Sequence, residues 1–135
     1  MSAALIDTSA ILGPRDALRL ALADVEDVAI SSITLAELEA GVVATSDWEE
    51  RFRRQQTFEW VKRTFRVIPV DEAVAAEFGK LCLLVSRIGR SSRGRRSLDL
   101  LIAATAVAHD LPLVTANGED LKGAEFYLRV IPLGA

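Results

Sequence analysis

Residues 5–12 read LIDTSAIL, an apolar run that gives way to Asp7 and a Thr-Ser pair. The run at 3–6 predicts a short buried strand, and Asp7 follows where that strand ends. In open α/β sheets, ligands bind in the crevice outside the carboxyl ends of the strands. Asp7 is therefore predicted to belong to a functional site, although Asp-Thr-Ser is also typical of a simple turn.

Strand-like and helical stretches alternate along the rest of the chain, which predicts an α/β domain with a mostly parallel sheet. Four more strands are expected at 28–30, 66–69, 112–115 and 129–132. Helices are expected at 14–24, 34–44, 48–63, 72–86 and 98–109, with caps at Thr34, Asp47, Asp71 and Ser97. Residues 88–96 (IGRSSRGRR) have no apolar periodicity and predict a mobile basic loop.

The composition is that of a globular protein, with 135 residues of which 50% are hydrophobic and 26% charged. We expect a single domain over residues 1–135. Its apolar runs are shorter than the ~20 residues of a membrane helix, and 1–6 lacks the basic start of a signal peptide. The single cysteine, Cys82, cannot form an internal disulfide and is expected to pack in the core, which favours a cytoplasmic location.

The charges are distributed unevenly, although the net charge is only −3. Residues 1–50 contain two basic and ten acidic side chains, whereas residues 51–96 contain twelve basic and four acidic ones. A basic middle segment between acidic ends can bind phosphates on one face and gather carboxylates on another. The alternative is an arginine-rich but merely solvated surface.

Two further carboxylates are expected at the same edge of the sheet as Asp7. Glu37 lies in the first turn of the helix after the second strand, although Thr34-x-x-Glu37 is also typical of a capping box. Asp99 is the second residue of the helix at 98–109, where the helix dipole favours a carboxylate by ~0.3–1 kcal/mol. The apolar run LLIAATAVA that follows predicts a buried helix, which holds Asp99 in a fixed position.

Carboxylates that gather without basic neighbours repel one another, and a divalent cation removes that cost. Mg²⁺ and Mn²⁺ prefer oxygen ligands, activate bound water and neutralise charge that grows on a phosphoryl group. His109, the only histidine, falls at an expected helix end, so hydrolysis by a pair of histidines is not expected. The acids therefore predict metal-dependent hydrolysis.

Four stretches carry a resemblance to the PIN-domain nucleases, and within them to the VapC-type toxins of bacterial toxin–antitoxin pairs. They are LIDTSAIL, SSITLAELEAG, RRSLDLLIAATAVAHDLPLVTANGEDL and the closing RVIP, and they span nearly the whole chain. The resemblance implies a three-layer α/β/α fold around a mostly parallel sheet of about five strands. It also implies cleavage of RNA with Mg²⁺ or Mn²⁺, a homodimer, and silencing by a VapB-type antitoxin whose tail can place an arginine in the acidic site.

The resemblance identifies three acids as catalytic and metal-binding residues: Asp7, Glu37 and Asp99. The family's fourth position, an Asp or Asn two residues after a threonine, falls on Asn117 after Thr115. Asp120 lies nearby and is expected to assist in binding metal. Ser9 and Thr115 match the hydroxyl residues that support the acids, whereas Leu121 stands where the family usually has an aromatic residue.

The expected basic loop leads directly to Asp99 and is predicted to hold RNA phosphates against the metal. The basic group consists of Arg87, which precedes the loop, and the four arginines within it, Arg90, Arg93, Arg95 and Arg96. A second basic group, on the helix at 48–63, extends this track in the same interpretation: Arg51, Arg53, Arg54, Lys62 and Arg63. Gly89 and Gly94 give the loop backbone freedom.

Two other functions remain open from the sequence. One is a PIN domain that binds RNA without cleaving it, because the fourth position is Asn117 rather than an acid. The other is a phosphoacceptor receiver domain, which also has an acidic Mg²⁺ site but needs a lysine after a late strand; none follows 113–115. Trp48 and Phe52 are either core residues or part of a partner site.

Overall fold

The strands form one sheet in which every neighbouring pair is parallel. The structure, a computed structural model that describes residues 2–133, orders the strands β3-β2-β1-β4-β5. Their bounds are β1 Ala3–Ile6, β2 Asp27–Ser31, β3 Arg66–Ile68, β4 Leu113–Thr115 and β5 Val130–Pro132. The chain thus adds β2 and β3 on one side of β1, and β4 and β5 on the other. The crevice between β1 and β4 is the place where such sheets bind ligands.

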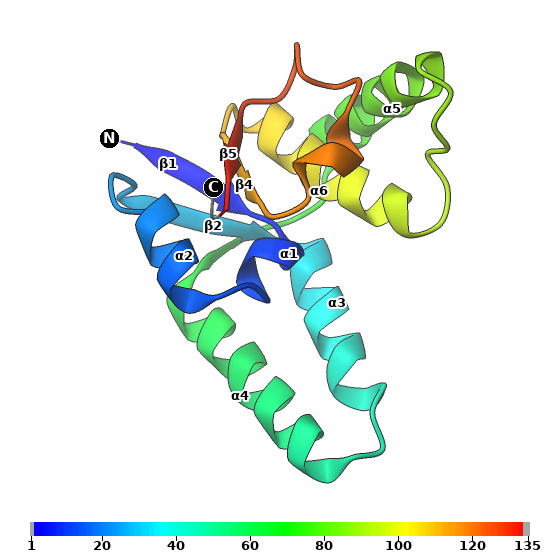
Figure 1. The fold of residues 1–135 in the computed structure, drawn as a ribbon. Helices are drawn as coiled ribbons and strands as arrows, with labels where there is room; N and C mark the ends of the chain where they lie inside the picture. The colour runs from blue at the N-terminus through cyan, green and yellow to red at the C-terminus, as the bar shows by residue number, and fades with distance from the viewer. Residues whose placement is uncertain (1, 134–135) are drawn as a thin grey trace.

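Helices cover both faces of the sheet, so the predicted three-layer α/β/α architecture is confirmed (Figure 1). The helices are α1 Thr8–Ile11, α2 Arg15–Ala21, α3 Ser32–Val43, α4 Trp48–Thr64, α5 Glu72–Arg87 and α6 Arg95–Ala108, with a short 3₁₀ helix, η1, at Gly118–Leu121. Successive strand residues alternate between the two cores, as the pleat requires. Leu5 and Leu113 pack with α5 and α6, whereas Ile6 and Val114 pack with α1 to α4.

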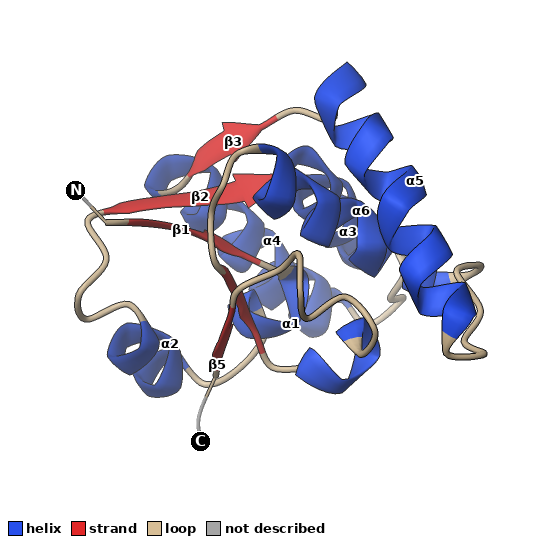
Figure 2. Ribbon diagram, turned by 90° about the horizontal axis from the view of Figure 1, so that it is seen from above, coloured by secondary structure: helices blue, strands red, loops and turns tan. Residues whose placement is uncertain are grey.

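Helices α2 and α5 lie on opposite sides of the sheet, as a view from above shows (Figure 2). Helix α6 is the most deeply buried. Of the seven residues from Leu100 to Ala106, all but Leu101 are buried, as the apolar run LLIAATAVA predicts. Cys82 packs at the margin of the same core as a half-buried free thiol. Within residues 2–133, no helix is both long enough and apolar enough to cross a membrane.

Two helices begin earlier than their sequence signals predict. Helix α3 starts after Ser31, whose side chain accepts a hydrogen bond from Ile33 N at 3.0 Å, so the expected cap at Thr34 is wrong. Helix α6 starts after Gly94, which has a φ of +69°. The expected cap at Ser97 is therefore also wrong; its hydroxyl donates to the Gly94 carbonyl at 2.7 Å. In both cases a residue three positions upstream already closes the first turn.

The caps expected at Asp47 and Asp71 are confirmed, because their carboxylates accept from Glu49 N and Val74 N. The short helix α1 was not predicted from the sequence. Four residues are too few to show a 3.6-residue period, so the LIDTSAIL stretch shows only its strand and its turn.

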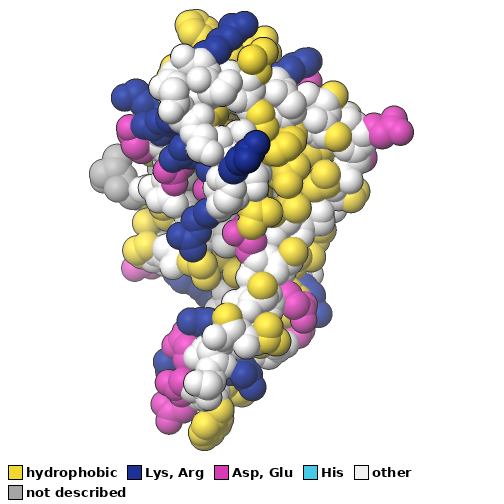
Figure 3. Space-filling model, turned by 90° about the vertical axis from the view of Figure 1, so that its right-hand side faces the viewer, with side chains coloured by type: hydrophobic (Ala, Val, Ile, Leu, Met, Phe, Trp, Pro, Cys, Tyr) yellow, Lys and Arg dark blue, Asp and Glu magenta, His cyan; other side chains and the backbone are white. Residues whose placement is uncertain are grey.

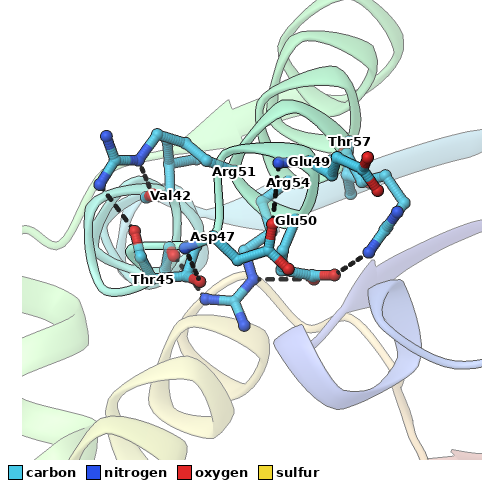
Figure 4. A network of polar contacts seen from close by, with 10 residues as sticks. Val42, Thr45, Asp47, Glu49, Glu50, Arg51, Arg54 and Thr57 are labelled. Atoms are coloured by element: carbon cyan, nitrogen blue, oxygen red, sulfur yellow. Dashed lines mark hydrogen bonds and ion pairs between the residues drawn. The ribbon is translucent and has the colours of Figure 1, made fainter.

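Helices α3 and α4 form a hairpin that projects away from the sheet (Figure 1). A polar network joins the end of one helix to the start of the other (Figure 4). Arg54 donates to Gly41 O at 2.7 Å, and Arg51 donates to Thr45 O at 2.6 Å. Gly41 lies in the last turn of α3 and Thr45 just beyond it, where few backbone carbonyls have partners inside the helix. The two arginines therefore stabilise the hairpin, and Glu50 receives ion pairs from Arg53 and Arg54.

Candidate active site

Asp7 follows the central strand β1 and caps helix α1. One carboxylate oxygen, Oδ1, accepts a hydrogen bond from Ser9 Oγ at 2.7 Å and another from Ala10 N at 3.0 Å. Asp7 forms the expected turn and stands at the carboxyl end of the strand; its membership of a functional site stays a prediction. The turn fixes one oxygen of the carboxylate and leaves the second without a partner among the described residues.

Glu37 reaches the same edge of the sheet from α3. Its Oε1 accepts a hydrogen bond from Thr8 Oγ1 at 2.6 Å, so the residue after Asp7 holds Glu37 directly. Thr8 Oγ1 also lies 3.1 Å from Thr34 Oγ1. The buried Thr34 hydroxyl accepts from Thr8 in that second contact, so Thr8 lies between Glu37 and Thr34. Thr34 therefore supports the site from inside α3 instead of capping the helix.

A second chain of hydroxyl groups joins Asp7 to the end of β4. Ser9 Oγ lies 3.3 Å from Thr115 Oγ1 and accepts from Ala116 N at 3.0 Å. The buried Thr115 in turn accepts from Asn117 N at 3.0 Å. Ser9 and Thr115, the two residues that the resemblance marks as supporting, thus lie between β1 and β4, the two strands that border the crevice.

Asp99 projects from α6 toward the other acids. Its pKa is raised from 3.8 to about 6, first by burial and then by the negative charges of Glu37, Asp120 and Asp7. The positive charge of Arg95 acts in the opposite direction. Asp99 therefore lies within electrostatic range of carboxylates from α1, α3 and η1, which are remote from one another in the sequence.

The fourth position is divided between two residues. Asn117 is exposed and precedes η1, and its side chain makes no capping hydrogen bond. Asp120, within η1, is half-buried and is one of the charges that raise the pKa of Asp99. Asp120 is therefore a stronger candidate for the fourth acid than the sequence alone suggests.

The acids share one electrostatic environment without forming a closed ligand set. Among residues 2–133, no three Asp, Glu, His or Cys side chains stand close enough together to make a ready-made metal site. Like charges keep carboxylates apart, and hydrogen bonds to Ser9 and Thr8 hold one oxygen of Asp7 and of Glu37. The described residues therefore contain no preformed ligand set of Asp7, Glu37 and Asp99. Their convergence on one cation stays a prediction, supported by the charges that act on Asp99.

The five arginines expected to bind RNA do not act alike. Arg90 donates to the Glu119 backbone carbonyl and pairs with its carboxylate at 3.0 Å, and Arg96 Nη2 lies 3.8 Å from Asp120 Oδ1. Arg90 thus attaches the loop after α5 to η1, and Arg96 attaches the first turn of α6 to it. The other three, Arg87, Arg93 and Arg95, have no ion pair with any described residue. Figure 3 shows basic and acidic side chains intermixed on this side of the molecule, not one continuous basic surface.

A groove begins at Thr8 and Glu37 and runs along α3 and α4, with a volume of about 480 Å³. Arg53 and Arg54 lie at its α4 side. Beyond it, Trp48 and Phe52 are 75% and 57% exposed. Of the two interpretations left open for this pair, the core is wrong and a contact surface remains.

Sequence reasoning missed Thr8 and Thr34. The sequence contains a signal for each. Thr8 adjoins Asp7, and Thr34 precedes Glu37 by three residues, so that Thr34 and Glu37 lie on one face of a helix. The capping-box interpretation concealed the second signal, because it assigned Thr34 to the helix end.

Comparison with known proteins agrees with this arrangement. The PIN domain family model matches residues 4–127. Ribonuclease VapC5 of Mycobacterium tuberculosis is 33% identical over 119 residues, which are 87% of this chain and 85% of that protein. The crystal structure of VapBC-5 from the same organism has a TM-score of 0.80 at 32% identity and is covered over 98% of this chain and 100% of its own. FitAcB from Neisseria gonorrhoeae has a TM-score of 0.75 at 27% identity, over 94% of this chain and 95% of its own. The family model spans strands β2 to β4, nearly all of β1 and every acid described above, and the chain belongs to the PIN-domain family.

Proposed function

We propose that this protein is a Mg²⁺- or Mn²⁺-dependent endoribonuclease, the toxin of a toxin–antitoxin pair. The observation that carries the proposal is the position of Asp99, half-buried on α6 and acted on by the charges of Glu37, Asp120 and Asp7. Desolvated acids with a strongly perturbed pKa in a crevice are typical of functional sites. The similar proteins from Mycobacterium tuberculosis and Rickettsia bellii are named ribonucleases.

The donor set fits a hard divalent cation. Asp7, Glu37, Asp99 and Asp120 offer carboxylate oxygens, and Asn117 offers an amide oxygen; Mg²⁺ and Mn²⁺ prefer such ligands. The pKa of Asp99 shows that the acids repel one another, and a cation offsets that repulsion. When bound, the ion activates water and stabilises the charge that develops on a phosphate during hydrolysis.

The chain's own residues orient these oxygens. Ser9 Oγ and Ala10 N donate to one oxygen of Asp7 and leave the other available to a cation. Thr8 does the same for Glu37. Thr115 holds Ser9 in place. Such outer partners fix the rotamers of ligating carboxylates, and Asp99 must lose its proton before it can serve as a ligand.

We infer further that RNA is the substrate, that a VapB-type antitoxin is the partner and that the protein acts in the cytoplasm as a homodimer or a toxin–antitoxin complex. The similar structures from Mycobacterium tuberculosis and Rickettsia felis are described as VapBC assemblies, the latter bound to promoter DNA. The receiver-domain alternative is wrong, because the chain belongs to the PIN-domain family.

Cleavage of structured RNA with and without EDTA tests the proposal. The variants Asp7→Asn and Asp99→Asn should lose Mn²⁺-dependent cleavage while they retain their circular dichroism spectra. A matched control is Glu39→Gln, which removes an exposed carboxylate two residues from Glu37 on the same helix. Equal activity in Asp99→Asn and in the wild type would refute the proposal.

A PIN domain that binds RNA without cleaving it is the second candidate, and exposed Asn117 in the family's fourth position favours it. In that case the wild type binds RNA with the salt dependence expected of phosphate contacts, but EDTA leaves the RNA binding unchanged and no cut RNA ends appear.

A further inference from the structure

Helix α6 begins with two arginines, Arg95 and Arg96, and has no acidic residue in its first turn. The N-terminal end of a helix carries partial positive charge, so cations there are unfavourable and acids are preferred. Neither arginine therefore helps the helix. A local arrangement that opposes its own helix is expected where a site requires it.

The guanidinium of Arg96 is only weakly engaged. Its Nη2 lies 3.8 Å from Asp120 Oδ1, an ion pair that is too long for a hydrogen bond, and Nη1 donates to Ser91 O at 3.3 Å. Its Nε is the single buried side-chain nitrogen or oxygen without a hydrogen-bond partner in residues 2–133. A guanidinium has five N–H groups, so most of the capacity of Arg96 is unused.

Asp120 is the acid that Arg96 partly neutralises. It lies close enough to Asp99 to raise the pKa of that carboxyl, which places Arg96 beside the proposed metal ligands. A divalent cation and a guanidinium cannot both take the same carboxylate oxygens at full strength. The cation therefore competes with Arg96 for Asp120.

We propose that Arg96 is an exchangeable counter-ion: it holds Asp120 until a divalent cation takes that carboxylate, and then binds an RNA phosphate beside the site. This inference rests on the proposed nuclease function. The exchange costs little hydrogen bonding, because the Asp120 contact is not a hydrogen bond and Nε has no acceptor to lose. The side chain of Arg96 is 29% exposed, so a phosphate can reach its planar fork from solvent.

The loop between α5 and α6, which leads to Arg96, is attached to the same short helix that carries Asp120. Arg90 attaches this loop to Glu119, in the same 3₁₀ helix as Asp120. Gly89 and Gly94 have φ values of +80° and +69°, which other residues rarely adopt, and they bracket the intervening segment. Arg96 can thus change its side-chain partner while the segment stays anchored through Arg90.

Calorimetric titration of the metal-free full chain with Mn²⁺, without RNA, is the first test. Arg96→Gln should bind Mn²⁺ about three- to tenfold more tightly than the wild type, because a competing positive charge is gone. The matched control Arg93→Gln removes the same charge three residues earlier, in the loop before α6, from an arginine that has no ion pair with Asp120, and should change the Mn²⁺ affinity by less than about twofold. In an Asp120→Asn background, Arg96→Gln should no longer tighten Mn²⁺ binding.

Steady-state cleavage is the second test. Arg96→Gln should raise the KM for RNA by about three- to tenfold, while the Mn²⁺ concentration for half-maximal rate falls. Weaker RNA binding together with tighter Mn²⁺ binding indicates exchange, whereas loss of a purely structural role would weaken the binding of both RNA and Mn²⁺. If Arg96→Gln does not fold, Arg96→Met replaces it, because Met keeps the apolar stem.

Weaker Mn²⁺ binding in Arg96→Gln, or an affinity equal to that of Arg93→Gln, would overturn the exchange. So would an unchanged KM. The parent proposal fails separately: if Asp99→Asn binds Mn²⁺ as the wild type does, the acids are not the metal site. If Asp99→Asn loses Mn²⁺ but Arg96→Gln does not gain it, only the role of Arg96 is refuted.

Discussion

Thr8 Oγ1 lies 2.6 Å from Glu37 Oε1, a contact that ties the residue after the first acid to the second acid across 29 positions of sequence. Through this contact, a residue just after the central strand β1 fixes the position of the Glu37 side chain on α3. Both ends of this contact are half-buried, so water does not readily replace it.

The first prediction concerns Thr8→Val, which keeps the shape of the side chain and removes its hydroxyl. Glu37 then loses its donor, and both the Mn²⁺ affinity and the cleavage rate should fall roughly tenfold, as is usual when an outer partner of a ligand is removed. Calorimetry and single-turnover cleavage measure these two quantities. Thr8→Ser should restore both, and an inactive Thr8→Ser would show that the methyl group matters instead.

The second prediction concerns the pKa of Asp99, which burial and nearby carboxylates raise to about 6 in the folded protein from its ordinary value of 3.8. A raised carboxyl pKa adds stability that is complete below pH 3.8 and is lost as the pH rises through 6. Metal-free Asp99→Asn should therefore be more stable than the wild type at pH 7.5, by on the order of 1 kcal/mol after allowance for solvent screening of a half-buried group. Urea unfolding in EDTA measures this difference.

The same comparison at pH 4.5 should show a much smaller gain, because Asp99 is then mostly protonated in the folded wild type. Asp16→Asn, at an exposed pair on α2, serves as the control and should not follow this pH dependence. A gain for Asp99→Asn that stays the same at both pH values would contradict the assigned pKa.

The third prediction concerns the start of α3. Ser31 is fully buried, and its hydroxyl caps the helix through Ile33 N at 3.0 Å. Ser31→Ala should lower the free energy of unfolding by about 1 kcal/mol, the usual cost of a lost cap. Thr34→Ala should leave the helix end intact, because Thr34 is not the cap. The helical content by circular dichroism and the urea midpoint distinguish the two variants, and a larger loss of helix in Thr34→Ala would restore the rejected capping box.

The fold was predictable because period and polarity agree along most of the chain. Strands such as 3–6 are short apolar runs, and α6 follows an apolar run too long for a strand, so both signals survive without tertiary context. The boundaries at Ser31 and Gly94 were not predictable in the same way. Several cap-forming residues stand close together at each place, and the packing of the helix against the sheet selects among them.

The acids of the site were predicted from the sequence because each follows an expected strand or lies in the early part of an expected helix at one edge of the sheet. Their order of importance was not. Asn117 and Asp120 are three residues apart, and only the turn into η1 decides which of them acts on Asp99.

The arginines show the same limit: Arg90 and Arg96 look like Arg93 in the sequence, but they pair with Glu119 and Asp120. Composition predicts that such residues are basic, whereas the partner of each depends on the fold.

The last prediction concerns Arg93 and Arg95, which have no ion pair with any described residue and so are the members of the loop available to RNA. The double variant Arg93→Gln/Arg95→Gln should weaken RNA binding and lower the slope of log K against log salt by roughly 1 to 1.5, since each contact with single-stranded nucleic acid releases about 0.7 counterions. Binding in EDTA, where hydrolysis is prevented, measures that slope by fluorescence anisotropy. Arg19→Gln, at an exposed arginine on α2 that pairs with Asp16, is the control and should leave the slope unchanged. An equal decrease in both proteins would mean that RNA responds to net charge alone, and that the loop has no defined contact with the phosphates.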